Sequence, residues 1–281
     1  MGRLELAGDA QPIAESIAFD AFSASTNFSA STNGVLVYLS GVGSGLQQFT
    51  WFDPQGQPHG TVGEPFIGGF VSEPALSPDE KRLAFARTDP QSGNVDIWID
   101  ELARDVPTRF TTDPGQNVEP LWAPDGSSIV FTGQRNGVWG LYRKPSNLVG
   151  GEKLLYKSHH GQPAYGTSWS RDGRYVLFQE QPDGVFALPM DEASGERKPI
   201  EVVPGEFNPR GARFLPDPHP LYVSYTSRVS GQDEIYVQTF DPNPASSPKP
   251  RPEQVSIGGG GSMRWREDGK RLFYMASANG E

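Results

Sequence analysis

The sequence predicts an all-β fold, a six-bladed β-propeller built from four-stranded antiparallel blades. Three observations predict it. One motif recurs six times with a period near 46 residues, every copy carries short β-forming runs separated by turn residues, and no segment shows helical periodicity of useful length. Four strands in each period of roughly 40–50 residues are typical of a propeller blade. Glycine (33) and proline (26) make about a fifth of the 281 residues, which suits a fold of many turns.

Each copy of the repeat is marked by an acidic or amide turn residue. An apolar residue, usually aromatic, lies three positions before it, as in Trp122, Trp169 and Trp265. The mark itself lies in Pro-Asp-Gly or a related tripeptide, whose members favour a tight turn. The marks are spaced by 46, 46, 47, 45 and 51 residues: Asn33, Asp79, Asp125, Asp172, Asp217 and Asp268.

The β-forming runs follow the turn in a fixed order. The run directly after the mark, such as "RLAFAR" or "YVLFQE", forms a hairpin with the run before it. A third run ("DIWIDEL", "EIYVQTF") and a fourth ("TRFTT", "PIEVV") complete the blade. We therefore predict a single propeller domain over 1–281, with blades one to five at 22–66, 67–112, 113–160, 161–204 and 205–257.

The sixth copy supplies only inner strands, in residues 258–281. A lone hairpin is marginally stable in water. Residues 1–21 contain the strand-like runs "RLEL" and "QPIAESI". We therefore expect the N-terminal segment to complete the sixth blade and close the ring, which removes exposed sheet edges. A closed ring of this kind is expected to be a monomer.

Composition argues against several classes of protein. The net charge of −10 disfavours nucleic acid and anionic membranes as partners. The absence of cysteine excludes disulfides, thiolate catalysis and zinc–thiolate sites, but it does not fix the compartment. No run of about 18 apolar residues suggests a membrane span, and the N-terminus shows no signal-peptide pattern.

The turn motifs "SPDEKRLAF", "APDGSSIVF" and "SRDGRYVLF", together with "DIWIDEL", resemble the WD40-like (PD40-type) repeats of TolB-type propellers. Their order along the chain looks closest to propeller regions fused to bacterial serine/threonine kinases. The resemblance implies a sensory or protein-docking module, periplasmic or extracytoplasmic if part of a kinase or TolB-like protein. None of the kinase's own motifs is present.

Catalytic motifs are sparse. The string "GVGSG" (41–45) has glycine where a nucleophile elbow needs serine. His159 and His160 are adjacent, so on a strand they point to opposite faces and rarely share a metal. The loops 89–96 and 113–119 carry carboxylates but lack the D-x-D-x-D-G pattern of a calcium loop. We expect no cofactor, with calcium as the open alternative.

The central channel is the best candidate site. Inner strands run toward the repeat turn, so the residues just before the aromatic of each repeat are expected to line the channel and its mouth. Acids fall in the second and third copies and arginines in the fifth and sixth, a pattern that could hold a peptide terminus or small zwitterion. Mutual salt bridging or solvation would explain the same residues: Glu73, Glu119, Tyr165, Arg210, Arg213 and Arg264.

The sequence thus favours a non-catalytic propeller that binds a protein, a peptide or a small ligand. The alternative is a metal-dependent propeller hydrolase of the lactonase type, with its site in the channel. That reading needs carboxylates converging from several blades, and Glu73 and Glu119 are the two at equivalent positions.

Overall fold

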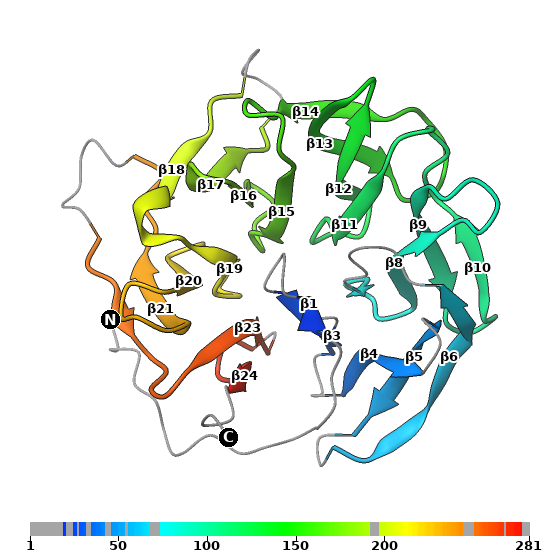
Figure 1. Cartoon of the computed structure of the whole chain (residues 1–281), viewed down its shortest axis with the longest axis horizontal. Coiled ribbons are helices and arrows are strands. Elements are labelled where there is room, and N and C mark those ends of the chain that lie inside the picture. The colour runs from blue at the N-terminus through cyan, green and yellow to red at the C-terminus, as the bar shows by residue number, and fades with distance from the viewer. Residues whose placement is uncertain are drawn as a thin grey trace.

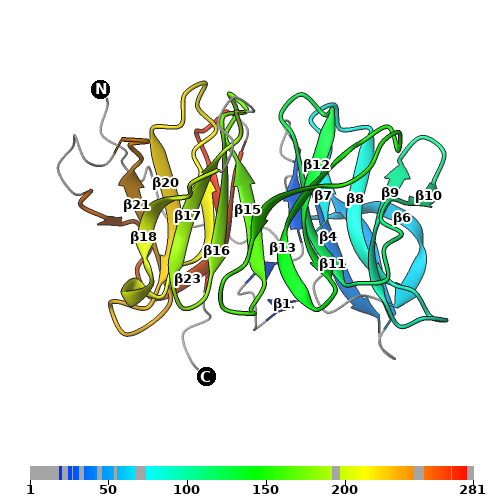
Figure 2. The same cartoon turned by 90° about the horizontal axis from the view of Figure 1, so that it is seen from above.

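The computed structural model describes residues 19–20, 25–26, 28–31, 35–42, 46–53, 56–67, 74–191, 197–243, 250–266 and 268–276. These residues form β-strands arranged as a ring of radial sheets, with one short 3-10 turn, η1 (Gly205–Phe207) (Figure 1). Seen from the side, the strands run between the two faces of the ring (Figure 2). The all-β propeller prediction is confirmed. No helix in this part of the chain could cross a membrane.

Five antiparallel sheets of four strands make the blades. Blade one contains β3 (Phe28–Ala30), β4 (Leu36–Val42), β5 (Leu46–Phe52) and β6 (Pro58–Ile67). Blade two contains β7 (Ala75–Leu76), β8 (Arg82–Thr88), β9 (Val95–Glu101) and β10 (Val106–Arg109). Blade three contains β11 (Asn117–Trp122), β12 (Ser128–Arg135), β13 (Val138–Pro145) and β14 (Lys153–Lys157).

The chain continues around the ring in the same order. Blade four contains β15 (Ala164–Trp169), β16 (Tyr175–Glu180), β17 (Gly184–Pro189) and β18 (Ile200–Pro204). Blade five contains β19 (Arg210–Phe214), β20 (Tyr222–Ser227), β21 (Glu234–Thr239) and β22 (Glu253–Gln254). Each strand pairs with the next in sequence, so each blade is a meander with its first strand innermost.

The prediction of six four-stranded blades is wrong: the structure shows five. The sixth repeat forms a two-stranded sheet of β23 (Gly260–Trp265) and β24 (Leu272–Ala276). Of the N-terminal segment predicted to close the ring, residues 1–21, the structure describes β1 (Phe19–Asp20), which pairs with β2 (Ser25–Thr26). A partner a few residues away costs little loop-closure entropy, which favours this local pairing. Residues 1–18 lie outside the described residues.

The repeat turns form as their sequence predicts. The side-chain oxygen of Asp125 accepts from Ser127 N–H at 2.9 Å, and Asp172 accepts from Arg174 N–H at 3.0 Å. The glycine after the mark takes φ of 69° at Gly126, a conformation that glycine adopts without a Cβ clash. Glu80 occupies the same place in blade two and takes φ of 56°. The turn therefore keeps its shape without its glycine.

The hydrophobic core lies between neighbouring blades. Separate clusters of buried side chains join blades one and two, two and three, three and four, and four and five. A fifth cluster, around Phe28 and Tyr38 of blade one, includes Phe273 of β24. The β23–β24 hairpin thus packs on blade one, and β23 also contacts the inner strands of blade five. The hairpin occupies the sixth position of the ring.

A β-bulge interrupts the inner strand in blades three, four and five and in the hairpin. The register shifts between Val118 and Leu121, Gly166 and Ser168, Arg210 and Arg213, and Gly261 and Arg264. Left-handed φ values of 54°, 58° and 50° accompany three of these bulges, at Glu119, Gly211 and Ser262. An extra residue in a strand changes which face the following side chains occupy.

Candidate binding site at the channel mouth

The bulge in each inner strand changes the direction in which the predicted site residues point. Glu119 sits at the bulge of β11, where its side chain is buried with 5% exposure. A non-glycine residue with positive φ is uncommon, and such backbone is enriched at functional sites. Glu119 therefore combines an unusual backbone conformation with a buried carboxyl group on the innermost strand of blade three.

Tyr165 joins three blades. Its half-buried side chain packs against Ala86 and Val95 of blade two and Val118 of blade three, although Tyr165 itself belongs to β15 of blade four. Contacts across three blades arise only toward the centre of the ring, where inner strands converge. Tyr165 therefore lies on the channel side of β15.

The residue just before the repeat aromatic contacts the next blade. Ser29 Oγ accepts from Leu76 N–H at 3.4 Å, and Ser168 Oγ accepts from Phe214 N–H at 3.1 Å. Arg213 and Arg264 occupy the same repeat position. The Arg264 guanidinium accordingly lies 5.2 Å from the centre of the Phe28 ring in blade one.

The three predicted arginines belong to two neighbouring inner strands, two to β19 and one to β23. Arg210, Arg213 and Arg264 are all half-buried. Arg264 Nη1 donates to the carbonyl of Met263 at 2.9 Å, and Ser224 Oγ donates to the carbonyl of Arg213 at 3.3 Å. β19 and β23 are neighbouring inner strands. The basic side of the predicted site therefore forms one sector of the ring, whereas Glu73 lies outside the described residues.

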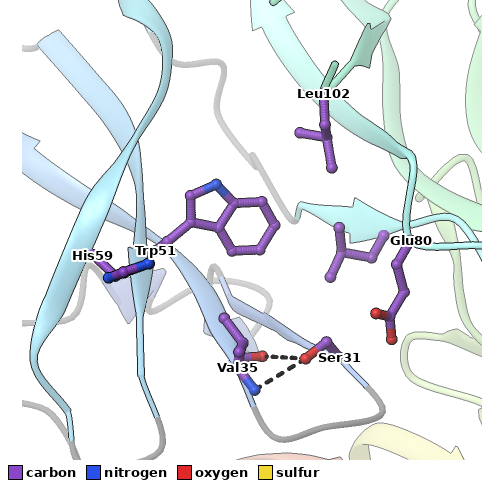
Figure 3. A pocket seen from close by; sticks show the side chains of 7 residues that line it. Ser31, Val35, Trp51, His59, Glu80 and Leu102 are labelled. Atoms are coloured by element: carbon purple, nitrogen blue, oxygen red, sulfur yellow. Dashed lines mark hydrogen bonds between the residues drawn. The ribbon is translucent and has the colours of Figure 1, made fainter.

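Sequence reasoning missed a hollow of about 310 Å³ between blades one and two. Trp51 projects from β5 toward Leu102 of blade two, and His59 and Glu80 contribute polar groups (Figure 3). Ser31 lies at its edge, donating from Oγ to Val35 O at 3.0 Å and accepting from Val35 N–H at 2.9 Å. The lining residues belong to two repeats and share no motif, so no pattern in the sequence signals the hollow.

Sequence reasoning also missed three buried carboxylates that fasten the connections between blades. Asp96 accepts from Thr111 Oγ1 at 2.8 Å and Asn117 Nδ2 at 3.1 Å. Arg109 also pairs with Asp96. These interactions join β9 to the segment that leads into blade three, which is a structural role.

Glu234 and Glu180 form the other two of these fastenings. Glu234 binds Ser256 Oγ and accepts from Gly259 N–H at 2.9 Å. Glu180 accepts from Ser158 Oγ and Tyr156 Oη, both at 2.5 Å. Burial raises the pKa of both glutamates, but these hydrogen bonds outweigh it and leave each pKa below its usual value.

The histidines have separate partners. His159 Nδ1 lies 2.9 Å from Tyr156 Oη, whereas His160 Nε2 lies 2.7 Å from Asp183 Oδ2. Among the described residues, no three histidine, aspartate or glutamate side chains gather closely enough to hold a metal ion. Any metal in the channel would need ligands of another kind or residues outside this set.

A ring of radial, four-stranded antiparallel sheets with one repeat per blade defines a β-propeller. Residues 66–203, just under half of the chain, match the family described as "TolB beta propeller domain" (PD40). The match covers blades two to four, where the turn motifs are most regular.

Two proteins named TolB are similar to parts of this chain. The Tol-Pal system protein TolB of Francisella tularensis subsp. tularensis is 33% identical over 113 residues, or 40% of this chain and 26% of that protein. The chain therefore spans about a quarter of that relative. The crystal structure of TolB from Acinetobacter baumannii superposes with a TM-score of 0.58 and 20% identity, covering 76% of this chain and 51% of that one.

A periplasmic gluconolactonase from Pseudomonas aeruginosa, PpgL, also has a similar structure. Its TM-score is 0.57 at 19% identity, covering 89% of this chain and 72% of that one. At such identities both solved structures show a shared fold. The fold alone does not distinguish a binding module from an enzyme.

Proposed function

We propose that this chain is a non-catalytic binding propeller that docks a protein or peptide partner at the channel mouth. The observation that carries the proposal is the match of residues 66–203 to the TolB propeller family. In this reading the chain is a sensory or scaffolding module of a TolB-like envelope protein or of a propeller-bearing bacterial kinase. The name of the curated relative, a Tol-Pal system protein, supports a role in an assembly.

The charge of the residues predicted at the mouth suggests what the chain binds. Arg210, Arg213 and Arg264 form a basic sector on β19 and β23, in a chain whose net charge is −10. Guanidinium groups bind carboxylates with planar, charge-assisted hydrogen bonds. A carboxylate of the partner, from a side chain or a chain terminus, is the group that this sector fits.

The test compares two triple variants. One changes Arg210, Arg213 and Arg264 to alanine, and the other changes Arg104, Arg228 and Arg251, which lie away from the inner strands and remove the same charge. Partners captured by each immobilised protein are identified by mass spectrometry, and the affinity of the purified partner is then measured by calorimetry. We expect the first variant to lose at least tenfold in affinity and the second to bind like the parent. Equal losses would overturn the assignment to the mouth.

The second candidate is a metal-dependent hydrolase of the lactonase type, and the similarity to PpgL favours it. Glu119 is the buried carboxyl group available on an inner strand, and calcium is the metal that carboxylate and carbonyl oxygens would suit. A metal that binds the native state raises the melting temperature. A calcium-dependent rise, together with lactone hydrolysis that Glu119→Gln abolishes, would establish the enzyme and displace the binding proposal.

A further inference from the structure

We propose that the contact between blades one and two is a pH-operated latch, in which a proton held between Asp100 and Asp105 keeps the β9–β10 turn against β6. Loss of that proton releases the turn from blade one. The proposal goes beyond the binding function above, since it involves neither the channel mouth nor its arginines.

Two carboxyl groups and the backbone of β6 meet at one point between the blades. Asp105 Oδ1 accepts from Gly63 N–H at 2.7 Å. A Cβ atom placed on Gly63 would lie 3.8 Å from both Asp105 Oδ1 and Asp100 Oδ2, so the two carboxyl groups flank the same glycine. Asp100 is 1% exposed, and its Oδ1 has no hydrogen-bond partner among the described residues. The turn is therefore joined to blade one beside a buried acid.

The position of Asp100 links neighbouring blades elsewhere in the ring. It lies on the third strand, opposite the second residue of β8, and the same place is taken by Lys144 in blade three and Gln238 in blade five. Lys144 Nζ donates to Phe110 O at 2.6 Å, and Gln238 Nε2 donates to Val202 O at 2.8 Å. Both acceptors come before the donor's own blade. An ionised carboxylate has no proton to donate, so Asp100 is a donor only when it is protonated.

The surroundings allow Asp100 to keep its proton up to mildly acidic pH. Burial, followed by the charge and the hydrogen bond of the Asp105 carboxyl, raises the pKa of Asp100 to about 6, and the hydrogen bond from Val106 N–H acts in the opposite direction. Below that pH the Asp100 hydroxyl donates to Asp105. Above it, two negative charges face each other and one of them is out of water, an arrangement that repels.

The other charged groups on the packed elements do little to offset this repulsion. The arginines of β8 and β10 are engaged with other groups: Arg82 with the Trp122 ring, Arg87 with the Trp98 ring and Arg109 with Asp96. The charged side chains of β6, of the turn and of the residue before β8 are exposed: His59, Glu64, Glu101, Arg104 and Lys81. Solvent screens exposed charges, so they do not neutralise a buried pair.

Asp105 is the member of the pair that can move. Asp100 is fixed because β9 is hydrogen-bonded to β8 on one side and to β10 on the other. Asp105 lies in an exposed turn with φ of 54°, a conformation that is uncommon for a residue with a side chain. Leu102 of the same turn lines the hollow between blades one and two (Figure 3). Deprotonation of Asp100 therefore moves the turn away from β6 and changes the wall of the hollow.

The test is amide hydrogen exchange at Gly63, followed by NMR on the full chain at pH 5 and pH 8 and corrected for the intrinsic pH dependence of exchange. We expect the protection factor of Gly63 N–H to fall at least tenfold at pH 8, with a midpoint near 6. The matched control is Gly211, whose N–H donates to Gln179 Oε1 of blade four at 2.9 Å, because this bond between blades contains no ionisable group. Its protection factor should change by less than about twofold.

Two variants separate the latch from a general loosening. Asp100→Asn keeps a donor at every pH, so Gly63 should stay protected at both pH values. Asp105→Asn keeps an acceptor for Gly63 N–H and removes the repulsion, so it should also abolish the fall, and it serves as the test if Asp100→Asn does not fold. Glu101→Gln should leave the fall unchanged.

Three results would overturn the proposal: equal protection of Gly63 at pH 5 and pH 8 in the parent, an equal fall at Gly211, or a fall that persists in both asparagine variants. The first would show that ionisation does not move the turn. The second would mean that the whole ring loosens, and the third that another group senses the pH.

Discussion

Two buried carboxyl groups respond oppositely to pH because their surroundings differ. Asp100 is 1% exposed and lies beside Asp105, whose Oδ1 accepts from Gly63 N–H of blade one at 2.7 Å. Burial, reinforced by the neighbouring Asp105 carboxyl, raises the pKa of Asp100 to about 6. Glu180 instead has three hydrogen-bond donors and a lowered pKa. The surroundings of each group, rather than its burial alone, set the direction of its pKa shift.

We expect Asp100→Asn to stabilise the protein at neutral pH. An acid with a raised folded pKa destabilises the native state as pH rises from its unfolded value near 4 through about 6. The variant should gain about 2 kcal/mol in unfolding free energy at pH 7 and little at pH 4. Urea unfolding at both pH values measures this, with Glu101→Gln as the exposed neighbouring control. A gain of equal size at the two pH values would contradict the assignment.

Glu180→Ala should destabilise the protein at pH 7. It removes the acceptor of the Tyr156 hydroxyl and of the His159 N–H, whereas Ser158 Oγ keeps the carbonyl of Gln162. Unsatisfied buried donors cost about 1–3 kcal/mol each, so we expect a loss of about 3 kcal/mol and a smaller loss for Glu180→Gln. Because the folded pKa is lowered, the contribution is complete above about 4.5 and is lost as pH falls through the folded pKa. Equal stability of the parent and Glu180→Ala in urea at pH 7 would refute this role.

At the scale of the elements, the repeat aromatic connects neighbouring blades. Trp122 Nε1 donates to Ala75 O of blade two at 2.9 Å, and the Arg82 guanidinium lies 4.5 Å from the centre of the Trp122 ring. Trp169 differs, because its Nε1 donates to Gly173 O within its own turn at 3.1 Å. The Arg143 guanidinium of blade three still lies 5.7 Å from the centre of the Trp169 ring, so the two positions differ in where the indole hydrogen bond goes.

Trp122→Phe should lower the unfolding free energy by about 1–2 kcal/mol, through the lost hydrogen bond and the weakened cation–π contact. It should also speed amide exchange in β7 and β8, the strands of blade two that Trp122 contacts from blade three. Trp169→Phe is the matched control: it loses a hydrogen bond only within its own turn, so its exchange effect on the neighbouring blade should be smaller. Unchanged exchange in β7 and β8 would show that the indole is not the link.

The sequence predicts the hairpins well because their information is local. Asp125 and Gly126 determine their turn through their own backbone preferences. The side of the sheet to which each inner-strand side chain points could not be predicted, since the bulges at Glu119 and Ser262 place non-glycine residues in left-handed backbone. Strict alternation of side chains along these strands assigns the wrong face to the residues beyond each bulge. The placement of Glu119 and Arg264 therefore needed coordinates.

At the scale of the whole molecule, the sequence overestimated the number of complete blades. Six turn motifs were counted as six blades, yet the motif specifies only the first two strands of each unit. The last motif therefore yields the β23–β24 hairpin, and the ring is completed by side-chain packing on both sides of it. The number of turn motifs predicts how many positions the ring has. The number of β-forming runs that follow each turn predicts which of those positions hold a complete four-stranded blade.

Trp265→Ala should weaken the ring as a whole. It removes a large half-buried side chain and the hydrogen bond to Ser224 that joins the hairpin to blade five. We expect a loss of about 3 kcal/mol in unfolding free energy, and amide exchange should speed in both β23 and β19. Arg266→Ala, which alters only the turn contact to Asp268, should change stability by less than about 0.5 kcal/mol. Exchange confined to β24 would show that the hairpin is not needed to hold the ring.

The buried carboxylates also determine where this chain can be cut and rejoined. Asp96 belongs to blade two, but it is bonded to Thr111 in the connection and to Asn117 in blade three. Glu234 is bonded in the same way to Ser256 and to the backbone of Gly259. A blade transplanted between propellers at the sheet boundary would carry its acid with it and lose the donors, which stay with the next connection. The unit that can be exchanged intact therefore extends past the blade to the first residue of the next inner strand.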